Sequence, residues 1–171
     1  MARRILIIFL LLTLASCAAL GDRMEARRWY DLGLEHSEAG RNMEAEESFR
    51  RAISISPGYA GAHDGLGRVY LDTGRHEDAI ESFERAVELR PGNAGYLKNL
   101  AEAYARTSRY QKSIETLTRA LELKPGDSGL RFSLGMVYLM KGDRALAMEE
   151  YKVLRRTDPE LAAELWELIL R

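Results

Sequence analysis

Cysteine is almost absent from this chain of 171 residues, which has only Cys17. A single cysteine excludes an intrachain disulfide and a zinc site built from several thiolates. The three histidines, His36, His63 and His76, are far apart in the sequence and lack the short spacing of metal ligands. We therefore expect neither a metal site nor a cofactor.

The chain also lacks an excess of positive or of negative residues. It has 25 Lys and Arg and 26 Asp and Glu, which gives a formal net charge of −1. Nucleic-acid-binding proteins need basic groups to meet the phosphates, so composition argues against such a partner. Acidic and basic residues follow one another at helical spacing. Pairs such as Glu81–Arg85 and Glu115–Arg119 are expected to stabilise helix surfaces by about 0.2–0.5 kcal/mol each. No catalytic constellation stands out, so the sequence predicts neither an enzyme nor a small-molecule substrate.

Proline is scarce as well, and its four copies, Pro57, Pro91, Pro125 and Pro159, lie 34 residues apart. Six further columns repeat with the same period, so the mature chain is built from four copies of one unit. These columns are the turn at Gly40, Gly74, Ser108 and Gly142; Leu32, Leu66, Leu100 and Leu134; Gly33, Gly67, Ala101 and Gly135; Ala45, Ala79, Ser113 and Ala147; Phe49, Phe83, Leu117 and Tyr151; and Ala52, Ala86, Ala120 and Leu154.

The pattern of each unit predicts two amphipathic helices, which are separated by the turn column. In residues 60–93, Leu66, Gly67 and Tyr70 share one face of the first half, and the second half has its own apolar face. Small residues let helices approach closely, and the large residue of the Phe column fills the gap between them. Proline ends the second helix because it lacks an N–H, and glycine suits the left-handed conformation of the turn.

The period and the columns resemble the tetratricopeptide repeat (TPR) family over residues 26–159, and the first unit carries the family's opening Trp29, Leu32 and Gly33. The resemblance implies an all-α protein, an α-solenoid of four helix-turn-helix units. These units span residues 26–59, 60–93, 94–127 and 128–161. Residues 160–171, ELAAELWELILR, are expected to form a C-terminal capping helix, with Leu161, Leu165, Leu168 and Ile169 on one face.

The N-terminus has the pattern of a targeting segment: Arg3 and Arg4, then an apolar run over residues 5–15. This run is too short to span a bilayer, which takes about 20 residues. The stretch Leu14-Ala15-Ser16-Cys17 resembles the bacterial lipobox. That resemblance implies a signal peptide over residues 1–16 and a lipid on Cys17. An ordinary signal peptide and a retained anchor are the alternatives.

Lipidation would attach the mature chain to the bacterial cell envelope, and Ala18 after the cysteine favours the periplasmic face of the outer membrane. We expect residues 17–25 to form a short tether. The first helix is predicted to begin near Arg23, because Asp22 and Glu25 resemble a capping box.

The resemblance also implies that a partner lies in the concave groove lined by the first helix of each repeat. The matching positions do not carry the carboxylate clamp of the chaperone-binding members. The middle of the groove has mixed charge and its C-terminal part is apolar, which indicates an interaction site unless Trp166 closes over the methionines. The candidate groove residues are Tyr30, Arg68, Lys98, Asn99, Glu102, Arg106, Phe132, Met136, Met140 and Trp166.

The sequence therefore favours a membrane-anchored protein-binding scaffold that holds another envelope protein near the membrane. It resembles the small repeat lipoproteins that assist assembly of type IV pilus secretins. The alternative is a structural module in which the apolar end of the solenoid pairs with a second copy to form a homodimer.

Overall fold

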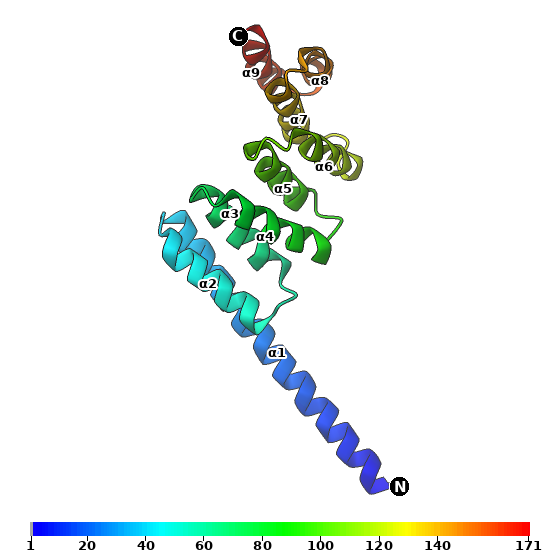
Figure 1. Cartoon of the computed structure of the whole chain (residues 1–171). Coiled ribbons are helices and arrows are strands. Elements are labelled where there is room, and N and C mark those ends of the chain that lie inside the picture. The colour runs from blue at the N-terminus through cyan, green and yellow to red at the C-terminus, as the bar shows by residue number, and fades with distance from the viewer. Residues whose placement is uncertain (1) are drawn as a thin grey trace.

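The computed structural model describes the backbone of residues 2–171 and the side chains of residues 20–171. Over this range the chain is all-α, as predicted, with no strand (Figure 1). The helices are α1 (Ala2–Glu38), α2 (Asn42–Ile55), α3 (Ala60–Asp72), α4 (His76–Leu89), α5 (Ala94–Arg106), α6 (Tyr110–Leu123), α7 (Ser128–Lys141), α8 (Arg144–Thr157) and α9 (Pro159–Leu170).

Successive helices pack as four hairpins, α1 with α2, α3 with α4, α5 with α6, and α7 with α8. The hairpins stack from the N-terminal to the C-terminal end (Figure 1). The backbone of each odd-numbered helix also lies close to that of the next odd-numbered helix, whereas within the described residues the backbones of the even-numbered helices lie farther apart. The odd-numbered helices therefore line the inner, concave side, which confirms the predicted α-solenoid.

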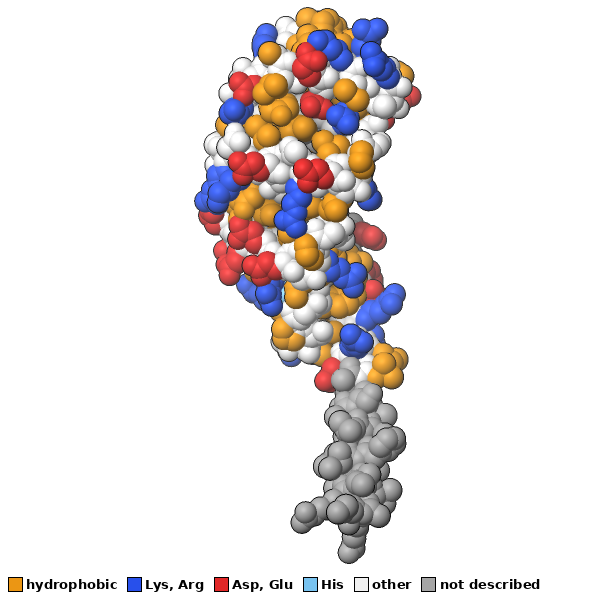
Figure 2. All heavy atoms as spheres, turned by 90° about the vertical axis from the view of Figure 1, so that its right-hand side faces the viewer, with side chains coloured by type: hydrophobic (Ala, Val, Ile, Leu, Met, Phe, Trp, Pro, Cys, Tyr) orange, Lys and Arg blue, Asp and Glu red, His pale blue; other side chains and the backbone are white. Residues whose placement is uncertain are grey.

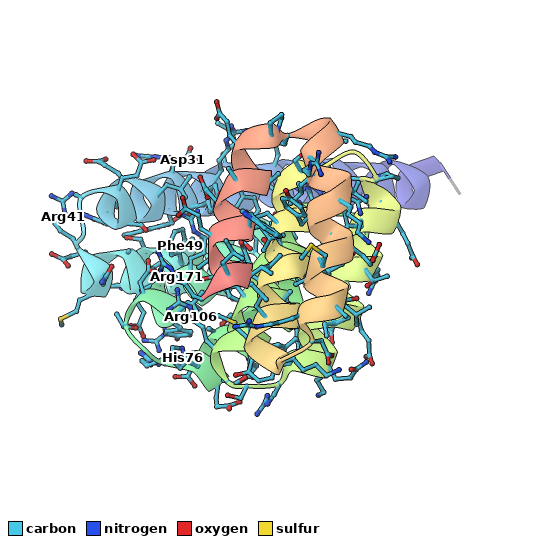
Figure 3. All side chains as sticks on the ribbon, turned by 90° about the horizontal axis from the view of Figure 1, so that it is seen from above. Asp31, Arg41, Phe49, His76, Arg106 and Arg171 are labelled. Atoms are coloured by element: carbon cyan, nitrogen blue, oxygen red, sulfur yellow. The ribbon has the colours of Figure 1, made fainter. Side chains whose placement is uncertain are left out.

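Large aromatic rings fill spaces that glycines leave open. A Cβ atom added at Gly33 or at Gly65 would lie 2.6 Å from the ring of Phe49, and one at Gly67 would lie 2.7 Å from the ring of Phe83. Both phenylalanines are almost completely buried. Seen from above, Phe49 lies among the helices, whereas Arg41 and His76 lie at the outer edge (Figure 3). A side chain at these glycines would push the helices apart.

The capping helix α9 completes the fourth unit. The Asp158 side chain accepts a hydrogen bond from the Leu161 N–H at 3.1 Å, and Pro159 is in the first turn of α9, where a missing N–H costs little. Leu165 is completely buried, and a Cβ atom at Gly135 would lie 2.7 Å from its Cδ2. Leu165 thus fills the space beside Gly135, and the predicted cap is confirmed.

The first helix begins earlier than the sequence indicated. The capping-box pattern placed its start near Arg23, after a tether, but α1 is continuous through Asp22. Residues 18–28 are mostly Ala, Leu, Met, Arg and Glu, which favour helix, so Asp22 lies inside the helix.

The signal peptide of residues 1–16 and the lipidation of Cys17 concern side chains outside the described range. Among the described helices, none combines the length and apolar character needed to cross a membrane.

Charged side chains link neighbouring repeats at the outer surface. Arg75 of the second repeat contacts Glu46 of the first at 3.1 Å, and Arg109 of the third contacts Glu77 of the second at 2.8 Å.

The two ion pairs expected within helices, Glu81–Arg85 and Glu115–Arg119, do not form. Arg85 contacts Glu88 instead, at 2.8 Å. Arg119 donates to the Pro91 carbonyl at 3.3 Å rather than to Glu115. On an exposed surface, long arginines have several partners of similar energy.

The mid-unit turns require a left-handed residue. Gly40, Gly74 and Gly142 have φ values of 71°, 77° and 92°, and Ser108 takes the same place in the third repeat with φ 59°. Among the described residues, Ser108 is the one non-glycine residue with positive φ. A β-carbon disfavours this conformation, so the third turn carries strain that the others do not.

We expect Ser108→Gly to stabilise the protein by about 0.5–1 kcal/mol, since relief of the left-handed strain exceeds the entropic cost of glycine. The midpoint of urea unfolding checks this expectation. Ser108→Ala is the control, because alanine keeps the β-carbon and should give no gain. A glycine variant no more stable than the alanine variant would show that the turn carries no strain.

Candidate partner-binding groove

The N-terminal part of the concave side has an aromatic floor. The Tyr30 ring packs edge-on against Tyr59, with centroids 5.1 Å apart, and lies 5.9 Å from Phe49. A Cβ atom at Gly61 would lie 3.3 Å from the Tyr30 ring, so glycine leaves room for this tyrosine. Burial raises the pKa of the half-buried Tyr30 hydroxyl, and Tyr59 and Tyr96 add to the effect. Tyr30 is therefore held in place by its neighbours.

The middle of the groove is polar, and its groups satisfy one another. The Asn99 side chain of α5 donates a hydrogen bond to the Asp64 carboxylate of α3 at 2.8 Å. Burial raises the pKa of Asp64 above its usual value, while the bond from Asn99 and the charge of Arg68 act in the opposite direction. Asn99 is thus engaged within the protein, whereas Arg68 is exposed to solvent.

Farther along the groove, the charge of Arg106 is paired with a carboxylate, whereas that of Lys98 is not. Arg106 donates from Nε and Nη2 to Oε1 of Glu102, at 3.1 and 2.8 Å. Lys98, one turn before Glu102 on the same helix, is exposed. Among the described side chains, its ammonium takes part in no ion pair or hydrogen bond.

A pocket of about 320 Å³ lies between α5, α6 and α7 at the C-terminal part of the groove. The sequence predicted five of the residues that line it: Lys98, Glu102, Phe132, Met136 and Met140. It missed Ala105, Leu117, Ser133 and Val137, which complete the lining.

Leu117 is the one residue of α6 that lines the pocket. It stands in the column that holds Phe49 and Phe83 in the first two repeats, and the glycine that those rings meet is replaced by Ala101. The smaller leucine occupies less of the space between α5 and α7 than a phenylalanine would. The departure from the Phe column was visible in the sequence, but its consequence depends on which helices meet there.

Trp166 does not cover this pocket. Its ring stacks on Tyr151 of α8, with centroids 5.0 Å apart and an interplanar angle of 27°. Trp166 is not among the residues that line the pocket, and the side chain of Met140 is 52% exposed. The methionines therefore remain open to solvent, and the structure favours the open groove over the closed local core.

Other hollows of the described residues lie away from the pocket. One of about 590 Å³ is lined largely by charged residues that contact one another, such as Arg75 and Asp78 at 2.8 Å. Another, about 860 Å³, lies on α1 beside Met24, Trp29 and Leu32. On the face in Figure 2, hydrophobic side chains gather in the upper part, over the C-terminal repeats, among charges of both signs. The paired charges of the first hollow offer little to a partner, and the second is lined by α1 alone, whereas three helices line the pocket, so the pocket is the stronger candidate.

The comparisons with known proteins agree with this architecture. A model of the tetratricopeptide repeat family matches three overlapping segments, residues 30–94, 65–128 and 98–162. The chain belongs to this family, whose members are generally non-enzymatic scaffolds for protein–protein interaction. No curated protein matches the sequence significantly.

Three solved structures illustrate the similarity. PilF of Pseudomonas aeruginosa is 28% identical, with a TM-score of 0.75, and the match covers 88% of this chain and 70% of PilF. MamA is 25% identical, with a TM-score of 0.71 and coverage of 83% and 78%. YrrB, a TPR protein with an unusual peptide-binding site, is 20% identical, with a TM-score of 0.69 and 83% of each chain covered.

The partly buried carboxylate of Asp64 makes stability depend on pH. We expect Asp64→Asn to stabilise the protein near about pH 7, because the amide still accepts the bond from Asn99 while the cost of burying a charge disappears. The pKa of Asp64 is raised in the folded state, so acid favours the folded wild type as the carboxylate becomes protonated. The advantage of the variant should therefore shrink toward about pH 4.

Urea unfolding at both pH values measures this effect. Asp64→Ala is the control, since it removes the charge and also leaves the Asn99 amide without an acceptor, and it should be less stable than Asp64→Asn. An advantage of the asparagine variant that is the same at both pH values would contradict the assignment to the Asp64 carboxylate.

Proposed function

We propose that this protein is a lipid-anchored adaptor of the bacterial cell envelope that binds a segment of a partner protein in its concave groove. The observation that carries the proposal is the open pocket beside Phe132, Met136 and Met140 on the inner side of the solenoid. Hollows with apolar walls are preferred sites for burying a partner's side chains, and flexible methionines adapt to what enters. The protein-binding character of the family supports the same conclusion.

The anchor would act at short range. The lipid would sit on Cys17, and α1 runs from this region directly into the first repeat. A helical connection advances about 1.5 Å per residue, so residues 18–25 would separate the folded units from the lipid by only about 12 Å. A partner in the groove would be kept near the membrane surface.

Assistance to the assembly of a pilus secretin is the most specific form of this proposal. It is supported by the sequence resemblance to small pilus-associated lipoproteins and by the likeness to PilF, of which the match covers 70%. In this view the groove holds a segment of the secretin subunit while the lipid directs the complex to the outer membrane.

Self-association is the second candidate. Several apolar residues of α8 and α9 remain exposed, with Val153, Trp166 and Leu170 at 37%, 36% and 65%. An exposed apolar end can pair with a second copy. Light scattering at micromolar concentration distinguishes this homodimer from a monomeric adaptor.

We expect Met140→Glu to lower the capture of envelope partners by about tenfold or more, since it places a charge at an apolar contact. Affinity capture after crosslinking in the native membrane measures this effect. Met43→Glu is the matched control, because Met43 is 84% exposed on α2, away from the pocket, and should leave capture unchanged. Equal capture by the two folded variants would place the partner elsewhere.

The anchor is tested separately. Intact mass analysis should show that the native chain lacks residues 1–16 and carries acyl groups on Cys17, whereas Cys17→Ala should carry none and leave the membrane fraction. Two or more acyl chains give stable attachment, so the shift in fractionation should be nearly complete. A native chain without an acyl mass would refute the lipoprotein proposal and leave the groove untouched.

A further inference from the structure

The shape of the pocket indicates what it accepts. Its base is formed by Leu117 and Val137, which are 1% and 4% exposed, and its walls by Phe132 and the two methionines. Leu117 replaces the phenylalanine that fills the corresponding space in the first two repeats. The pocket is thus a place in a regular stack where the family's own aromatic ring is missing.

Its size fits a side chain better than a separate small molecule. At about 320 Å³ the pocket lies at the lower end of the range for drug-sized ligands. It also opens toward the groove, because Met140 and Lys98 are exposed. One bulky apolar side chain, presented by a longer segment in the groove, can enter it.

The charged residues at the rim of the pocket place a second requirement on the partner. Lys98 and Glu102 are its charged residues, and Glu102 is already neutralised by two hydrogen bonds from Arg106. Lys98 is not engaged within the described part of the protein, so the rim has an excess of one positive charge. A charge at a binding rim favours partners of opposite sign and disfavours those of like sign.

We propose that the pocket selects a protein segment in which a bulky apolar side chain lies next to an acidic one: the apolar side chain enters between Phe132, Met136 and Met140, and the carboxylate meets Lys98. This inference rests on the proposed function and specifies the chemistry of its partner.

The test uses the full chain and an array of synthetic peptides of about twelve residues, long enough to occupy a groove. Each peptide carries Leu, Phe or Met flanked by Asp and Glu, by Lys and Arg, or by Ser and Asn. The acidic set should bind about tenfold more tightly than the basic set, and Lys98→Glu should reverse this order. Lys124→Glu is the matched control, because it makes the same charge change after α6, outside the pocket, and should keep the wild-type order.

A second variant tests the pocket without creating a charge. Leu117→Phe combined with Ala101→Gly restores the ring and glycine of the first two repeats, so it should fold and fill the pocket. Circular dichroism checks the helical content. We expect this variant to lose binding of all the apolar peptides, whatever their charge.

The outcomes separate this inference from the proposed function. Equal binding of acidic and basic peptides, or binding that survives in the filled variant, would overturn the inference. Failure of the wild type to bind any apolar peptide would overturn it as well. If native partners are still captured in a manner sensitive to Met140→Glu, but with no response to Lys98→Glu, the adaptor function stands and the acidic partner does not.

Discussion

The close approach of helices across glycine is the constraint on which the rest of the structure depends. Phe49 and Phe83 occupy spaces that exist only because Gly33, Gly65 and Gly67 have no side chain. This contact joins the helices of one repeat and, through Gly65, one repeat to the next. Each unit has too little apolar surface to be stable alone, so the stack acquires its core by repeating the same contact.

Departures from this contact produce the individual features of the protein. In the third repeat, Leu117 and Ala101 replace the ring and the glycine, and a pocket opens. In the fourth, Leu165 of α9 fills the space beside Gly135, so Tyr151 is free to stack on Trp166. A regular scaffold thus supplies the shape, and two irregular positions of the Phe column, Leu117 and Tyr151, supply the difference between its middle and its C-terminal end.

The polar groups of the groove also differ between its middle and its C-terminal end. In the middle, Asp64 and Asn99 satisfy each other, which stabilises the contact between α3 and α5 and leaves little for a partner. Toward the C-terminal end, Arg106 neutralises Glu102 and leaves Lys98 exposed beside apolar walls. In one part of the groove the polar groups bind one another, and in the other part a cation and apolar side chains are exposed. Such a groove can hold a partner in one position rather than anywhere along its length.

The sequence by itself determined the fold, because a strict 34-residue period with fixed small, large and proline columns leaves few ways to bury the apolar faces. It also identified five residues of the pocket, since groove positions follow from helical phase. It misplaced the start of α1, where a weak cap was overridden by helix-forming neighbours. Only the tertiary structure decided that Trp166 stacks on Tyr151, that Asn99 is engaged by Asp64 and that Leu117 leaves a space, because each of these depends on contacts between residues distant in the chain or on different helices.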